Sequence, residues 1–176
     1  MNKTGLLVLH PAQLFWRIVY EAFAMHLPSW WRPAKTLRVY CAQRFCREVA
    51  ATANINAKAR LSPQTIIGPH GGVGERCILT GEVFVGSHVT MGPDCYLITG
   101  DHPVPPDGGR FRDLAPVHKP IRIEEDVFLG ARVILLPGVT VGRGAAVGAG
   151  SVVAKDVPPG SVVVGNPARI VRSRKV

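Results

Sequence analysis

Residues 49–97 read VAATANINAKARLSPQTIIGPHGGVGERCILTGEVFVGSHVTMGPDCYL, and every sixth residue of this stretch is aliphatic. The series is Val49, Ile55, Leu61, Ile67, Val73, Leu79, Val85, Met91 and Leu97. A period of six excludes an α-helix, whose apolar faces recur about every 3.6 residues. It fits short strands joined by tight turns, in which each aliphatic side chain points inward and stacked coils pair their parallel edges. The stretch therefore predicts a parallel β-solenoid of hexapeptide repeats.

The period breaks after residue 102 and returns two residues out of phase. The second series is Ile123, Leu129, Leu135, Val141, Val147 and Val153. Glycine follows many of these aliphatic residues, and we expect it to supply positive φ angles in the turns. About three coils are predicted in 49–102 and a little over two in 123–164, which makes the chain an all-β protein apart from its amino end.

The amino-terminal 48 residues follow a helical pattern instead. Apolar residues at helical spacing are Leu14, Phe15, Ile18, Val19, Ala22 and Phe23 in a first helix, and Leu37, Tyr40, Cys41 and Phe45 in a second helix over 34–47. We expect these helices to cap the open end of the solenoid, which would otherwise expose strand edges. The elbow Trp30-Trp31-Arg32 equally suits a lipid headgroup layer, so peripheral membrane contact through 1–48 stays open beside the capping role.

The chain of 176 residues is strongly basic, with 21 Lys and Arg against 12 Asp and Glu and a net charge of +9. Such a balance favours anionic partners. The chain carries no basic stripe interleaved with aromatic residues, which argues against nucleic acid. No apolar run is long enough to cross a bilayer, and Gly5–Leu9 is too short for a signal peptide. Four cysteines without paired metal spacing predict a protein of the reducing cytoplasm that needs no metal.

The segment 103–122 interrupts the solenoid with a long run that has no apolar period. A loop of that length in a compact domain is usually functional. It begins directly after His102, at the end of the last intact hexad. Transfer of an acyl group to a hydroxyl needs a base whose pKa lies near about 7, and histidine meets that need. His102 is therefore the candidate base.

Thr99-Gly-Asp-His-Pro-Val104 resembles the histidine segment of galactoside and maltose O-acetyltransferases and of the colanic-acid type of polysaccharide acetyltransferases. Further similarity to this hexapeptide-repeat acyltransferase family lies in Pro120–Gly130, Leu136–Gly142, Gly148–Pro159 and Val164–Arg169, and in all it covers about 61–172. The resemblance implies a left-handed parallel β-helix with three faces per coil.

Three parts are then expected: a helical cap at 1–48, a β-helix acyltransferase domain at 49–168 with the extruded loop 103–122, and a basic tail at 169–176. A coil of eighteen residues places Cys77 beneath Cys95, so both thiols are expected to pack in the core.

Position by position, the resemblance assigns the general base to His102 and backbone contacts with the pantetheine arm of coenzyme A to Ala131 and Ala149. It assigns contacts with the phosphates of coenzyme A to Lys155, Arg169 and Arg172, whose side chains suit phosphate. The implied reaction is direct transfer from acetyl-CoA to a sugar hydroxyl, without a metal or an acyl-enzyme, in a homotrimer with sites between subunits. The implied acceptor is a cell-surface polysaccharide or its lipid-linked precursor.

Two features depart from the sugar acetyltransferases. Phe128 stands where a tryptophan packs near the thioester, and their acceptor-binding asparagine and carboxylate have no clear counterparts. Another small acceptor such as an amino sugar, serine or a xenobiotic therefore stays open, as does N-acetylation. A non-catalytic solenoid scaffold is the alternative from a different class. A γ-type carbonic anhydrase is disfavoured, because it needs a closely spaced histidine pair that this chain lacks.

Overall fold

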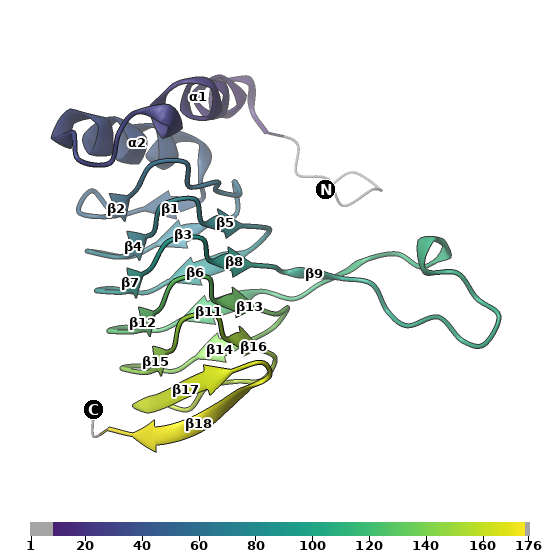
Figure 1. Ribbon diagram of the computed structural model, residues 1–176. Coiled ribbons are helices and arrows are strands. Elements are labelled where there is room, and N and C mark those ends of the chain that lie inside the picture. Colours follow the sequence, from purple (N-terminus) through teal and green to yellow (C-terminus); the bar gives the residue numbers. More distant parts are fainter. Residues whose placement is uncertain (1–8, 175–176) are drawn as a thin grey trace.

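The structure, a computed structural model, describes residues 9–174 (Figure 1). Residues 48–165 wind into a stack of coils whose short strands line three sides. Two helices lie across one end of the stack, and one long loop leaves it near the middle. The chain is thus a parallel β-helix with helices at its amino end.

Three sheets run along the stack. The first contains β1 (Glu48–Val49), β3 (Ile66–Ile67), β6 (Val83–Val85), β11 (Ile121–Ile123) and β14 (Thr140–Val141). The second contains β7 (Thr90–Met91), β12 (Phe128–Leu129), β15 (Ala146–Val147), β17 (Ser161–Gly165) and β18 (Ala168–Ser173), and the pair β2 (Asn54–Ile55) and β4 (Gly72–Val73) continues that side. The third contains β5 (Ile78–Leu79), β8 (Tyr96–Leu97), β13 (Ile134–Leu135) and β16 (Val152–Val153).

The predicted six-residue period is confirmed. Every aliphatic residue of both series is buried, and together they fill the centre of the stack. Neighbouring coils pair in parallel at an offset of eighteen residues, as in Ile67 beside Val85 and Ile134 beside Val152. The three sides follow from this offset, because three hexads make one turn.

The glycines that follow the aliphatic residues serve a different purpose from the one expected. Their φ angles are not positive; those of Arg76 and Arg132, two residues further into the turn, are. A Cβ on Gly130 would lie 2.6 Å from the backbone N of Ala149, in the next coil. These turns need glycine because the backbone of the next coil passes too close for a side chain.

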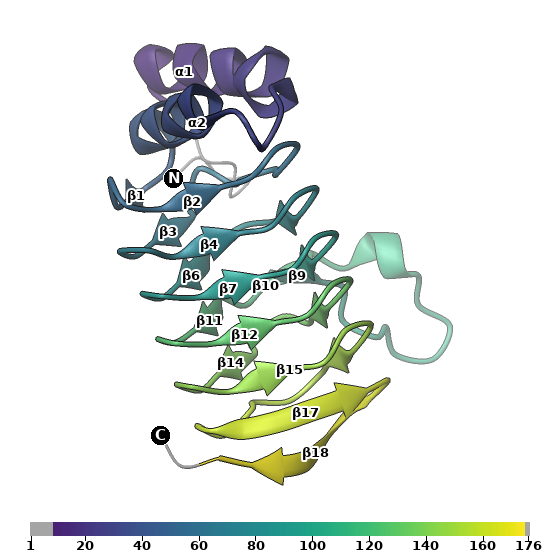
Figure 2. The same ribbon diagram turned by 60° about the vertical axis from the view of Figure 1, so that its left-hand side comes forward.

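The helical segment comprises α1 (Pro11–Ala22), the short 3-10 helix η1 (Ala24–His26) and α2 (Arg32–Phe45). It lies over the first coil, whose outer edge has no further coil to pair with (Figure 2). Helical-segment groups bond to that edge: the hydroxyl of Tyr20 donates to the Ala59 carbonyl over 2.7 Å, and the Met25 carbonyl accepts from the N–H of Lys58 over 2.7 Å. Edge groups that would otherwise be buried without partners are thereby satisfied.

Arg38 is a fully buried guanidinium within this segment. Its Nε donates to the Ile55 carbonyl over 2.8 Å, and its Nη1 donates to the Leu27 carbonyl over 2.9 Å. Burial lowers the pKa of Arg38, and no ion pair of Arg38 occurs within residues 9–174. Arg38 therefore joins α2 to the first coil through backbone carbonyls.

Several of the apolar residues at helical spacing do not face the core. Leu14, Phe15, Ile18 and Phe23 are exposed, while Trp16, Val19 and Tyr20 pack against the core. In α2 the exposed residue is Tyr40, whereas Val39 and Ala42 are buried. The first helix carries apolar residues on more than one side, so spacing alone does not show which side packs inward.

The loop and the carboxyl end differ from their expected boundaries. Strand β9 (Gly100–Asp101) pairs antiparallel with β10 (Val117–His118) at the loop stem, the 3-10 helix η2 (Phe111–Asp113) lies within the loop, and β11 returns the chain to the first sheet by residue 121. The expected tail is largely strand β18, which pairs antiparallel with β17. Without β18, strand β17 would be the edge of the second sheet. The pairing with β18 gives hydrogen-bond partners to the backbone groups on that edge. Residues 1–8 of the expected cap and 175–176 of the expected tail lie outside the described residues.

None of the helices in residues 9–174 is long and apolar enough to span a membrane.

Candidate active site

His102 lies at the base of the loop, directly after β9, and is exposed. Strand β9 continues the direction of β8 away from the coil stack (Figure 1). The backbone N–H of His102 donates to Oδ1 of Asp101 over 2.8 Å, so this carboxylate is engaged by the backbone. A second histidine stands on the other side of the stem, since the ring of His118 lies against Gly100. The candidate base therefore sits on a two-stranded stem outside the core.

Ala131 and Ala149 occupy equivalent turns, one coil apart, between the second and third sheets. The neighbouring turn amides are used within the stack, because Arg132 donates to the Pro93 carbonyl and Gly150 to the Ala131 carbonyl. Neither Ala131 nor Ala149 donates its own N–H in the backbone network of residues 9–174. Two amide donors in one column are thus available to a ligand.

Lys155 and Arg169 line one pocket of about 570 Å³ at the carboxyl end of the stack. The wall of the pocket also includes Ala154, Pro167 and one acidic residue, Asp156. Lys155 follows strand β16, and Arg169 lies on β18, which folds back along β17. The antiparallel return of β18 therefore brings two cations together that are far apart in sequence. The two cations outnumber the one carboxylate of the wall, so the pocket favours an anionic ligand.

Arg172 is placed elsewhere. It lies opposite Val162 in the β17–β18 pair, is exposed, and does not line the pocket. The cation after it, Arg174, donates to the Gly144 carbonyl and pairs with Asp126. Of the carboxyl-terminal cations, Arg169 therefore lines the pocket, whereas Arg172 and Arg174 lie outside it.

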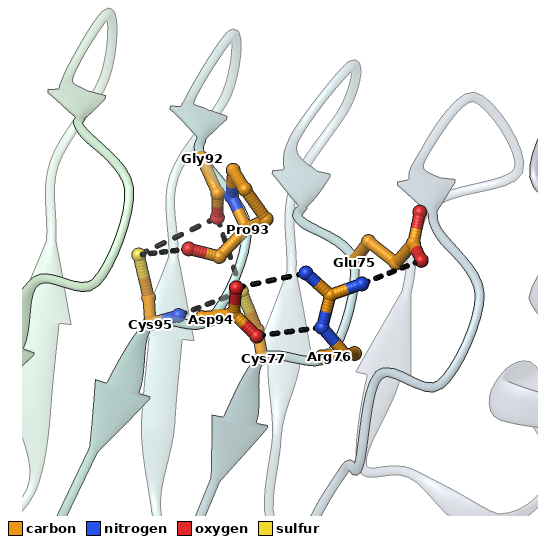
Figure 3. A network of polar contacts seen from close by, with 7 residues as sticks. All are labelled: Glu75, Arg76, Cys77, Gly92, Pro93, Asp94 and Cys95. Atoms are coloured by element: carbon orange, nitrogen blue, oxygen red, sulfur yellow. Dashed lines mark hydrogen bonds and ion pairs between the residues drawn. The ribbon is translucent and has the colours of Figure 1, made fainter.

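A second groove, of about 470 Å³, was not predicted from the sequence. Its walls are Arg76, Asp94, Tyr96, Arg132 and Ile134, on the third side of the stack. Arg76 holds Asp94 through two hydrogen bonds of 2.7 and 2.8 Å, as Figure 3 shows. The Arg76 guanidinium holds the pKa of Asp94 below its ordinary value. The eighteen-residue offset of residues 76 and 94 was the sequence signal that could have found this pair.

Cys77 and Cys95 lie just inside that network and are fully buried, as expected from the coil length (Figure 3). The Cys77 thiol donates to the Gly92 carbonyl over 3.2 Å, and its interaction with the Cys95 side chain, together with burial, holds the pKa of Cys77 above the ordinary value. Both thiols pack in the core, where their full burial keeps them from acting as nucleophiles. Within residues 9–174 no group of three or more His, Cys, Asp or Glu side chains could hold a metal ion.

Comparisons with known proteins agree with the repeat pattern. A family model described as the hexapeptide repeat of succinyl-transferase matches residues 120–155. A galactoside O-acetyltransferase of Lactococcus lactis subsp. lactis is 47% identical over 91 residues, which is 52% of this chain and 43% of that protein. Over these matched parts the chain is similar to acetyltransferases with hexapeptide repeats. It spans less than half the length of the first curated relatives it matches.

Two solved acetyltransferase structures are similar to nearly the whole chain in fold. A maltose O-acetyltransferase from Clostridium difficile 630 has a TM-score of 0.77 at 23% identity, with 95% of this chain and 90% of that chain covered. A hexapeptide-repeat acetyltransferase from Vibrio cholerae O1 biovar eltor, solved with acetyl coenzyme A, has a TM-score of 0.71 at 26% identity, with 100% and 97% covered.

The structure brings the residues assigned from the sequence together in two groups. Ala131 and Ala149 share one column of turns, and Lys155 and Arg169 share one pocket. His102 joins neither group, since it stands on the loop stem and lines neither of the two pockets described above. A single chain thus presents the parts of a site in separate places.

Proposed function

We propose that the protein is an acetyl-CoA-dependent O-acetyltransferase that acts on a sugar hydroxyl of a cell-surface polysaccharide or its precursor. The observation that carries the proposal is the pocket shared by Lys155 and Arg169. Strand β16 separates Lys155 from the turn of Ala149, so a cation of the pocket and an amide without a backbone acceptor flank one strand. A long donor with a polyanionic end and an amide-bearing arm suits that arrangement.

In the proposed mechanism the His102 imidazole takes the proton of the acceptor hydroxyl during attack. The hydroxyl oxygen bonds to the acetyl carbonyl carbon, and a backbone N–H stabilises the negative charge that forms on the carbonyl oxygen. The carbon–sulfur bond then breaks, and the thiolate of coenzyme A takes up a proton. Holding both substrates in one ternary complex supplies the proximity that the reaction needs, so no acyl-enzyme is required.

The proposal includes a left-handed β-helix and a homotrimer in which each site lies between two subunits. Its support is the separation of His102 from the donor pocket of its own chain, together with the loop that carries the chain away from its own coils (Figure 1). In this arrangement a neighbouring subunit completes each site. Arg172 does not line the pocket, so it would contact only the end of the donor that extends out of the pocket.

The domain assignment is part of the same proposal. The helical segment up to residue 48 caps the β-helix, supported by the hydrogen bonds of Tyr20 and Arg38 to the first coil. The β-helix domain then extends through β18, with the loop as an insertion. The cytoplasm is the proposed location, at the inner face of a membrane when the acceptor is lipid-linked; four free, buried cysteines suit that reducing compartment.

Acetylation assays with acetyl-CoA and a panel of saccharides test the proposal. His102→Ala is expected to lower kcat by about 10²- to 10⁴-fold and to leave acetyl-CoA affinity nearly unchanged. His118→Ala, on the opposite strand of the same stem, is the matched control and is expected to keep most of the activity. A fully active His102→Ala protein, free of contaminating transferase, would remove the assignment. Absence of any acetyl-CoA binding by calorimetry would instead favour a non-catalytic scaffold.

A further inference from the structure

Helix α1 presents an apolar stripe away from the protein. Leu14, Phe15 and Ile18 lie on one side of the helix and are 48%, 57% and 56% exposed. The opposite side of α1 packs through Trp16, Val19 and Tyr20, so the exposed stripe is not needed for the core. Large apolar side chains that cluster in the open are typical of an interaction surface.

The stripe lies at the outer end of the molecule. Figure 2 shows α1 farther from the coils than α2, so its outward side faces along the axis of the stack. Four more exposed aromatic residues belong to the helical segment, among them Phe23 directly after α1 and Trp30 shortly before α2. Trp30 is 83% exposed, the highest value among the large apolar residues of this segment. Tryptophan favours the boundary between water and lipid.

The positive charge of the helical segment indicates which kind of partner the stripe binds. Residues 10–47 contain six Lys and Arg and one acid, Glu21, and that acid is paired with Arg17. Arg32, Lys35 and Arg44 have no ion-pair partner within residues 9–174, and α2 contains no acidic residue. Two copies docked through this end would bring their unpaired cations together, which opposes self-association. An anionic lipid surface complements both the charge and the apolar stripe.

We propose that the helical segment docks on an anionic membrane surface, with Leu14, Phe15 and Ile18 inserted among the lipids and Trp30 at the headgroup level. Helix α1 lies in the plane of the membrane, and the axis of the coils stands upright on it. The loop stem that carries His102 then lies some coils above the surface, on the side of the stack. This docking does not depend on the proposed acetyltransferase activity.

Co-sedimentation of the full-length protein with vesicles tests the docking. We expect binding to vesicles of about 30% phosphatidylglycerol in phosphatidylcholine, little binding to phosphatidylcholine alone, and release at about 0.5 M salt. The double variant Phe15→Ser/Ile18→Ser is expected to lower the partition coefficient about tenfold or more. Phe111→Ser is the matched control, because Phe111 has the same 57% exposure as Phe15 but lies on the loop, and its binding is expected to be unchanged.

Both variants change exposed side chains, and circular dichroism with thermal unfolding shows whether they stay folded. Acetylation of a soluble acceptor is expected to be the same for Phe15→Ser/Ile18→Ser as for the unchanged protein, which separates this test from that of the proposed function. No binding to anionic vesicles at low salt would overturn the inference, as would equal binding of Phe15→Ser/Ile18→Ser. Lipid-free association that this variant abolishes, without vesicle binding, would assign the stripe to a second copy instead.

Discussion

Gly130→Ala tests the close stacking of the coils and the donor site together. The added Cβ would lie 2.6 Å from the backbone N of Ala149 and 2.9 Å from its Cα. Ordinary contacts begin at 3.4 Å, so the backbone of Ala149 has to move by about 0.8 Å. The φ angle of Gly130 is not positive, so alanine fits its conformation and crowding is the only cost.

Two effects are expected from this displacement. Overpacking of this kind lowers the free energy of unfolding by about 1–3 kcal/mol. A shift near 1 Å in a group that holds a substrate costs up to about 10²-fold, so we expect KM for acetyl-CoA to rise about tenfold. Urea unfolding measures the first effect, and steady-state kinetics with calorimetry of coenzyme A measures the second.

Gly86→Ala is the matched control. Its Cβ would lie 2.7 Å from the carbonyl carbon of Glu124, which is nearly the same crowding at a turn between the first and second sheets. It should lose similar stability and keep the KM for acetyl-CoA. If Gly130→Ala loses stability but binds coenzyme A normally, the Ala149 amide is not a donor contact. If neither variant loses stability, the argument from close coil stacking is refuted.

Two further predictions concern the pocket and the core. Lys155→Ala or Arg169→Ala should raise KM for acetyl-CoA, with about 1.5–3 kcal/mol of binding free energy lost per charged phosphate contact. Arg143→Ala, at an exposed position outside the pocket, should leave KM unchanged. Unchanged coenzyme A binding in the Lys155→Ala/Arg169→Ala double variant would show that neither residue contacts the donor. Burial raises the pKa of Cys46 from 9.0 to about 12, so the unfolded chain releases this proton first and stability should fall as pH rises from about 9 to about 12. Cys46→Ala should flatten that part of the stability curve, and an unchanged slope in this variant would contradict the assignment.

The coil architecture could be predicted because it rests on a local, repeated constraint. Each sixth residue must point inward, and one missing aliphatic residue would leave a hole in the core, so the period is visible without any tertiary information. The purpose of the glycines could not be predicted. Whether Gly74 or Gly130 needs positive φ or only the absence of a side chain depends on the backbone of the next coil.

The candidate site was only partly accessible from the sequence. The run around His102 and the run around Lys155 are each recognisable, but their relation in space depends on how the loop and β18 leave the stack. The Arg76–Asp94 pair follows from the same offset that predicted the stacked cysteines, yet the groove beside it also needs Tyr96 and Ile134 from neighbouring coils. Side-chain direction at turns is not encoded by the hexad period.

The sequence by itself determined the parallel β-helix, its interruption near residue 102 and the inward residue of each hexad, because stacking identical turns leaves one arrangement for a six-residue period. Only the tertiary structure decided which side of α1 packs, where the loop rejoins the stack and that β18 folds back to bring Arg169 beside Lys155. Those outcomes depend on the two ends of the stack and on its one interruption. At these places the repeat stops, and contacts between residues distant in sequence determine the conformation.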